Sequence, residues 1–124
     1  MVQNMPRTLE EALKEHNDWK VRLLLYVNGS RQFSGDSLGS SASCALGAWL
    51  RSMKPRYGTL PEYQRVMEIH ARFHTCAQEI IDLAREGKTF EARQALSEQG
   101  PFAVVNAELG REILYLKRRM AKAA

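Results

Sequence analysis

Three histidines and two cysteines are the side chains of this 124-residue chain that are best suited to binding a metal ion. His70 and His74 are four residues apart, and on a helix this spacing places two imidazoles one turn apart on one face, where both can bind one ion. The pair alone is a weak signal. The glutamate that follows the first histidine in helical zinc proteases is absent, because Ala71 stands there.

Cys44 supplies a softer ligand near the start of a predicted helix, where the partial positive charge of the helix terminus favours the thiolate. With His16, His70 and His74 it makes a set of three imidazoles and one thiolate, which suits tetrahedral zinc. Magnesium and calcium prefer oxygen ligands. Four protein ligands leave no position for water or substrate, so the set favours a structural or sensing metal and predicts no catalytic residues. Zinc affinity should fall as the pH drops toward the range where imidazoles titrate.

The residues alone leave two alternatives open. One is a metal-dependent enzyme with an open three-histidine site, although no general base accompanies the ligands, since Glu15 and Glu68 fall off the core-facing stripes. The other is a metal-free interaction bundle in which hydrogen bonds satisfy the histidines and Cys44 is a small buried side chain. Cys76 lies about 200° around the helix from His74 and is predicted to be a packing residue or a secondary thiol.

The elements that must position these residues are predicted to be helices. Capping-box patterns begin at Thr8 and Thr59, Asn28-Gly29 and Gly87 end helices, and residues 30–43 form a Ser/Gly-rich loop. Apolar residues recur at helical spacing, and no strand-like alternation occurs. The predicted core stripe of the third helix consists of Tyr63, Met67, His70, His74, Ala77, Ile81 and Ala84, and that of the last helix consists of Phe102, Val105, Leu109, Ile113, Leu116 and Met120. The predicted helices cover residues 9–28, 43–53 (stopping before Pro55), 59–87, 89–98 and 102–120. The predicted fold is all-α, an antiparallel four-helix bundle with a short additional helix, in one domain of residues 1–124 with a core at about 9–116.

Composition excludes several classes of protein. The net charge is +4, but Lys117, Arg118, Arg119 and Lys122 supply much of it at one helix end, a pattern typical of a solvated helix terminus, so no nucleic-acid binding is predicted. No secretory signal and no apolar run of about 18 residues is found, so no membrane insertion is predicted. We expect the protein to be cytoplasmic. In that reducing compartment a cysteine is a thiol or a metal ligand.

Three motifs together resemble the chemoreceptor zinc-binding domain, or CZB domain, over roughly Leu9 to Leu116. In chain order they are His16-x-x-Trp19, then Cys44-x-Leu46-Gly47-x-Trp49-Leu50, and then His70-x3-His74. The resemblance implies that His16, Cys44, His70 and His74 hold Zn2+ in a four-helix bundle, commonly a homodimer, with Trp19 and Trp49 packed around them.

The resemblance also implies a role in signal transduction. Domains of this family are appended to bacterial chemoreceptors and diguanylate cyclases, so chemotaxis and cyclic di-GMP signalling are the expected settings. They tune the partner's output when zinc is bound, and some are thought to sense oxidants through the zinc-bound cysteine. No methyl-accepting, PAS or cyclase domain is attached here, so we expect a stand-alone member that acts in trans, or else a fragment of a fusion.

Overall fold

A computed structural model describes residues 9–29 and 44–123, all of it helices and their connections. The described helices are α1 (Leu9–Val27), α3 (Ala45–Tyr57), α4 (Pro61–Arg85), α5 (Thr89–Ala95) and α6 (Pro101–Ala123). No strand occurs among these residues, which confirms the all-α prediction. The first predicted capping residue, Thr8, and the predicted loop 30–43 lie outside the described residues. Within the described ranges, no helix has both the length and the apolar character that crossing a bilayer requires.

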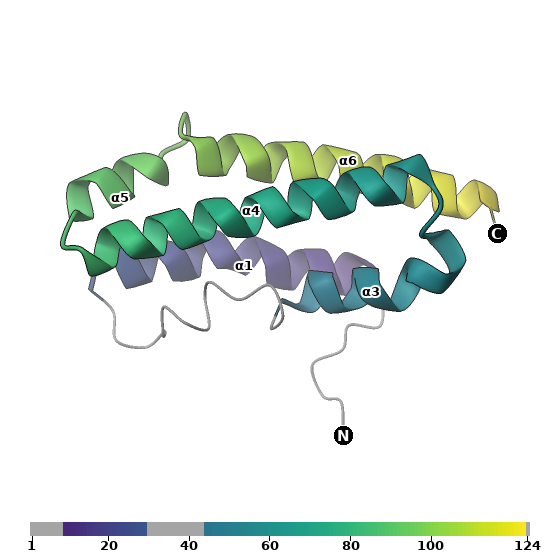
Figure 1. Ribbon diagram of the computed structural model, residues 1–124, viewed down its shortest axis with the longest axis horizontal. Helices are drawn as coiled ribbons and strands as arrows, with labels where there is room; N and C mark the ends of the chain where they lie inside the picture. Colours follow the sequence, from purple (N-terminus) through teal and green to yellow (C-terminus); the bar gives the residue numbers. More distant parts are fainter. Residues whose placement is uncertain (1–8, 30–43, 124) are drawn as a thin grey trace, which may run out of the picture.

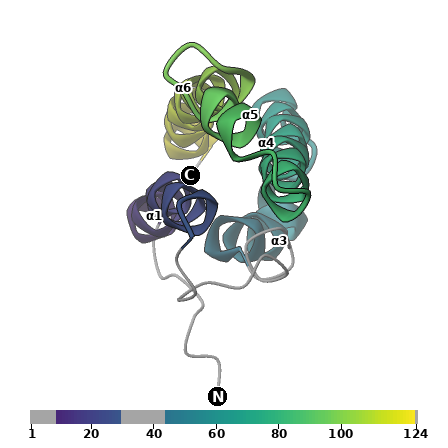
Figure 2. The same cartoon turned by 90° about the vertical axis from the view of Figure 1, so that its left-hand side faces the viewer.

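The long helices lie along one axis, and successive ones (α1, α3, α4, α6) run in opposite directions (Figure 1). Seen end-on, they surround a common interior, with the short α5 continuing the layer of α6 (Figure 2). The most extensive contact between helices is that of α4 with α6. The shorter α3 packs mainly against α1 and touches α4 over a smaller region. This arrangement brings α1, the start of α3 and the middle of α4 to one stretch of the interior.

Helical periodicity explains the core. On α6 the predicted stripe is confirmed: its first five members are buried and Met120 is half-buried. On α4 the buried face is wider than the predicted stripe, and Met67, predicted to be in the core, is 36% exposed. The buried apolar residues of this face that lie outside the predicted stripe are Val66, Ile69, Phe73 and Ile80. The wider face follows from packing, because α4 contacts α1, α3, α5 and α6.

Proline does not end α3 where the sequence predicted. The helix continues through Pro55 to Tyr57, and Gly58 then donates its backbone N–H to the carbonyl of Lys54 (2.8 Å). Pro55 removes only its own bond to the Arg51 carbonyl. Arg51 and Pro55 are both exposed, so water can solvate that carbonyl, and the last turn stays helical.

The predicted capping box at Thr59 is also wrong. The residue at the N-cap of α4 is Leu60, with no side-chain cap, and Pro61 begins the helix. Proline needs no partner for a backbone N–H in the first turn, and its φ already suits a helix, so it sets the start one residue later. Gly29 and Gly87 have positive φ (96° and 80°) just beyond α1 and α4, as the predicted helix ends require.

Polar contacts fix the helices against each other. The hydroxyl of Tyr63 on α4 donates to the carbonyl of Leu50 on α3 (2.6 Å), and both residues are buried. The buried carboxylate of Glu112 on α6 pairs with Arg65 on α4 (3.0 Å). These bonds hold α3 and α6 to α4 at the end of the molecule where α4 begins.

Candidate metal centre

Cys44 is the N-cap of α3, with extended backbone angles (φ −80°, ψ 125°). Its carbonyl accepts the first helical hydrogen bond, from Ala48 (3.0 Å), while its side chain is 1% exposed. A thiol at this position lies beside the first backbone N–H groups of the helix, whose partial positive charge stabilises the thiolate. The local fold therefore favours loss of the Cys44 proton when a metal binds.

His70 and His74 lie in the middle of α4 on its buried face, with exposed fractions of 5% and 6%. Their rings meet edge to face, with centroids 4.6 Å apart. The two Nε2 atoms are 3.1 Å apart, and Nε2 of His70 is also 3.4 Å from Sγ of Cys44. Both histidines therefore direct the same ring nitrogen at one point, which Cys44 reaches from α3.

These distances fit a zinc ion. Bond lengths of about 2.0–2.1 Å to nitrogen and 2.3 Å to sulfur, at tetrahedral angles, place two nitrogens about 3.3 Å apart and a nitrogen and a sulfur about 3.6 Å apart. The observed separations of 3.1 Å between the two nitrogens and 3.4 Å between nitrogen and sulfur are close to these values. The three donor atoms lie within 4.8 Å of one another, and all three residues are buried. Small movements of side chains would open the triangle enough for zinc.

Burial keeps both imidazoles neutral. Desolvation lowers the pKa of His74 to about 4. It is also the largest cause that lowers the pKa of His70 to about 4, with smaller effects from His74 and Arg51. At neutral pH only the thiol has to lose a proton when metal binds. Protons should therefore compete with the metal for these histidines only at a pH well below the range where imidazoles ordinarily titrate. This pH is lower than the sequence alone suggested.

Aromatic side chains surround the histidines. Trp19 on α1 meets the ring of His74 edge to face at 5.1 Å, and Phe73 meets it at 5.3 Å. Trp19 and Trp49 are buried, as expected, and so are Leu46 and Leu50 on α3. Such surroundings exclude water and strengthen bonds between charged ligands and a metal.

The fourth predicted ligand, His16, lies on α1, but its side chain is outside what the structure describes. Its position is three residues before Trp19, so it shares a helix face with a residue that contacts His74. The structure thus brings together Cys44, His70 and His74, and it places residue 16 on α1. Cys76 is half-buried and is not part of the three-residue cluster.

Two neighbours of the site were not found by sequence reasoning. Phe73 is buried between His74, Trp19 and Phe102. The sequence feature that could have identified it is the wide distribution of apolar residues around α4. Arg51 lies near enough for its positive charge to help lower the pKa of His70. Arg51 could have been identified from its position in the sequence, two helical turns after Cys44.

The fold and the cluster define a class of protein, a small helical domain with a buried cysteine–histidine metal site. The chain matches the family described as the chemoreceptor zinc-binding domain, CZB, over residues 16–81, which is more than half its length. It belongs to this family, whose domains bind zinc. No curated protein and no solved structure matches the chain.

Proposed function

We propose that this protein is a zinc-responsive regulatory domain in which the metal is held by Cys44, His70, His74 and His16. The observation that carries the proposal is the convergence of Sγ of Cys44 and Nε2 of both α4 histidines within one buried cluster. The family match covers all four residues and supports His16 as the ligand that closes the site. With four protein ligands the ion would have no open position, which favours sensing over catalysis.

The scaffold we propose is an antiparallel four-helix bundle of α1, α3, α4 and α6, with α5 as the short additional helix. Successive long helices alternate in direction, and an ion pair between Lys117 and Glu10 links α6 to α1 (Figures 1 and 2). The hydrophobic core is continuous over these helices, which supports one domain for residues 1–124.

The moving part in this proposal is the first half of α3. Tyr63 fixes the middle of α3 by its bond to the carbonyl of Leu50. The helix as a whole has a small area of contact with α4. A metal bond from Cys44 to the α4 histidines would add a strong link at that end. Loss of zinc, or oxidation of the Cys44 sulfur, would remove this link and change the surface of the domain.

Zinc removal should therefore speed backbone amide exchange in the first half of α3 more than elsewhere. We expect the protection of the amides of residues 48–50 to fall at least ten-fold in zinc-free protein, because the metal bond opposes local opening there. Hydrogen exchange followed by mass spectrometry or NMR measures this, with residues 105–116 of α6 as the internal control. Equal changes in α3 and α6 would contradict a local release.

A metal-dependent hydrolase is the weaker candidate, since the cluster that the described residues form consists of Cys44, His70 and His74 and includes no carboxylate. Cobalt substitution distinguishes the two. The regulatory site predicts a thiolate-to-cobalt absorption band that is lost in Cys44→Ser, whereas an open three-histidine site predicts an exchangeable water and no such band.

The proposed partner is a bacterial signalling protein, a chemoreceptor or diguanylate cyclase, reached in trans or through a fusion. A thiolate ligand suits a reducing compartment, so we place the domain in the cytoplasm. We also propose a homodimer. Among the described residues, three apolar side chains on one side of α1 are exposed: Val21 (57%), Leu24 (44%) and Leu25 (40%). A patch of this kind is typical of an interface.

Analytical ultracentrifugation tests the homodimer. We expect wild-type protein to sediment as a dimer at micromolar concentration and Val21→Glu/Leu24→Glu to sediment as a monomer, because two charges in the interface would have to be desolvated. The matched control is Leu114→Glu on α6, a residue 52% exposed. A monomeric wild type, or equal dissociation by both variants, would contradict an α1 interface.

A further inference from the structure

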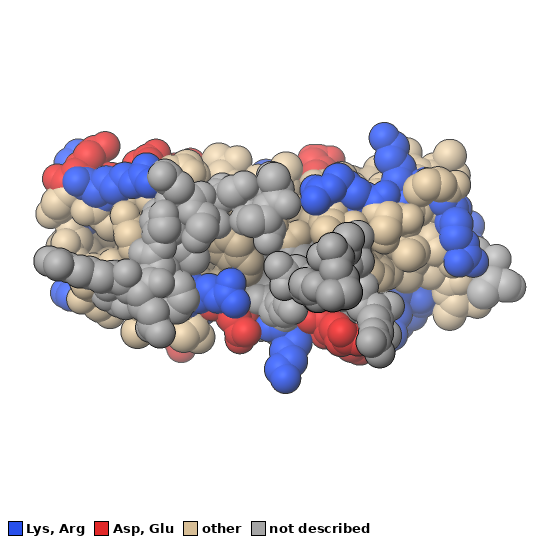
Figure 3. All heavy atoms as spheres, turned by 90° about the horizontal axis from the view of Figure 1, so that it is seen from below, with Lys and Arg blue, Asp and Glu red and all other residues tan. Residues whose placement is uncertain are grey.

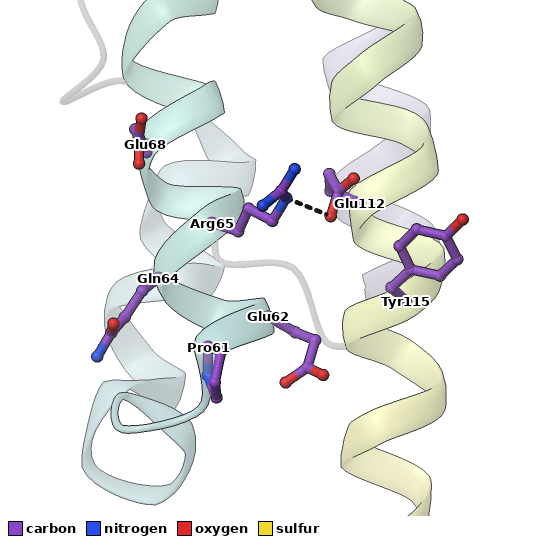
Figure 4. A pocket seen from close by; sticks show the side chains of 7 residues that line it. All are labelled: Pro61, Glu62, Gln64, Arg65, Glu68, Glu112 and Tyr115. Carbon is purple, nitrogen blue, oxygen red and sulfur yellow. Dashed lines mark ion pairs between the residues drawn. The ribbon is translucent and has the colours of Figure 1, made fainter.

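Between α4 and α6, away from the histidines, lies a groove that the zinc site does not use. It consists of a hollow of about 540 Å³ and an adjoining one of about 200 Å³. Both are lined by Glu62 at the start of α4 and by Tyr115 on α6, so the two hollows meet at these residues. Figure 4 shows Glu62 and Arg65 reaching from α4 into the space before α6.

The two parts of the groove carry opposite charges. The larger hollow is lined by Glu62, Glu68 and Glu112 against Arg65 as its one base. The smaller hollow is lined by Arg118, Arg119 and Lys122, with Glu62 at the junction. Figure 3 faces α1 and α3 rather than the groove, and on that face too Lys and Arg lie at the end of the molecule where α6 ends. The groove is thus acidic toward the middle of α6 and basic toward its end.

The ion pairs differ in strength along this groove. Glu112 is buried and held by Arg65 at 3.0 Å, with Arg111 at 3.7 Å, so its charge is balanced. Glu62 and Arg119 are only loosely paired, at 3.8 Å. Oε1 of Glu62 is shielded from solvent, and no hydrogen bond from the described residues reaches it. The side chain of Glu62 as a whole is still 32% exposed, so the rest of this carboxylate can accept a hydrogen bond from a ligand in the groove.

We propose that this groove binds a small zwitterion, an amino acid with a guanidinium or primary ammonium side chain. Its cationic group would donate to Glu62 in the larger hollow, beside the ring of Tyr115. Its carboxylate would accept from Arg119 and Arg118 in the smaller one. Both halves of the loose pair then gain a closer partner, and the Arg65–Glu112 pair forms a fixed wall. The proposal does not depend on zinc binding.

A titration of zinc-loaded protein with L-arginine, followed by amide chemical shifts, tests the proposal. We expect saturable shifts in residues 62–65 and 112–119. Glu62→Gln should weaken binding about ten-fold or more, because a charge-assisted bond is lost. Glu98→Gln, an exposed carboxylate outside the groove, is the matched control and should change affinity less than two-fold.

Agmatine, which has the guanidinium but no carboxylate, tests the basic half. We expect it to bind about ten-fold more weakly than L-arginine to wild type, and Arg119→Gln to bind both ligands equally weakly. Zinc content should stay the same in every variant, so this test is independent of the metal site. The proposal is overturned by the absence of saturable shifts, by equal loss in Glu98→Gln, or by wild-type affinity for agmatine equal to that for L-arginine.

Discussion

Zinc affinity is expected to fall about 100-fold or more when Cys44 is replaced by alanine. A structural zinc site contributes about 10–16 kcal/mol of binding free energy, so one of four ligands accounts for about 3 kcal/mol, which is about 100-fold. Competition with a chromophoric chelator at fixed pH measures the affinity. His70→Gln should show a loss of the same order, because Nε2 of His70 lies between the other two donor atoms.

Cys76→Ala is the matched control for Cys44→Ala. Cys76 is the second free cysteine and is half-buried on α4, outside the cluster, so its removal should leave zinc affinity within about two-fold. His16→Ala tests the proposed fourth ligand in the same titration, and a loss comparable to that of Cys44→Ala is expected. Zinc bound equally well by Cys44→Ala and wild type would refute the site. An unchanged affinity in His16→Ala alone would remove only the ligand from α1.

Metal-free protein is expected to lose much of its stability between pH 7 and pH 4. Folding lowers the pKa of His70 and His74 from 6.5 to about 4, chiefly through desolvation. Since the unfolded chain binds these protons more readily, the stabilisation is fully present above about pH 6.5 and is lost as the pH falls through about 4. The shift corresponds to about 3 kcal/mol for each histidine, on the scale of the whole stability of a domain this size.

Denaturant unfolding with chelator present, repeated between pH 7 and pH 4, measures this effect. His70→Gln/His74→Gln removes both titrating groups and keeps the acidic residues, so its stability should change less steeply over the same range. Parallel pH dependence in wild type and the double variant would show that the two imidazoles are not the cause. Saturating zinc should flatten the wild-type curve above about pH 5, because bound metal stabilises only the folded state.

Much of the site could be predicted because it depends on local geometry. The four-residue spacing of His70 and His74 places both rings on one helix face whatever lies around them. The prediction of the apolar stripe on α6 was correct because it also depends only on helix periodicity. Cys44 was placed near a helix start, and the structure confirms it there as the N-cap.

Helix ends and the width of the buried face could not be predicted, since several neighbours determine them together. Proline stops a helix whose carbonyls have no other partner, yet the exposed last turn of α3 tolerates Pro55. Met67 fits the α4 stripe by spacing, but α1, α3, α5 and α6 all pack against α4 and shift its core toward Val66, Ile69 and Phe73. The loose Glu62–Arg119 ion pair joins residues far apart in the chain, so no local sequence pattern predicts it.

The sequence by itself determined the types of ligand, the pairing of His70 with His74 and the helical class, because ligand chemistry and helix periodicity act over a few residues. The tertiary structure decided that Cys44 meets those histidines across 26 residues of chain, and that burial lowers their pKa to about 4. It also decided that Trp19 covers His74. These properties depend on desolvation and on contacts between helices, which exist only once α1, α3 and α4 have packed around a common interior.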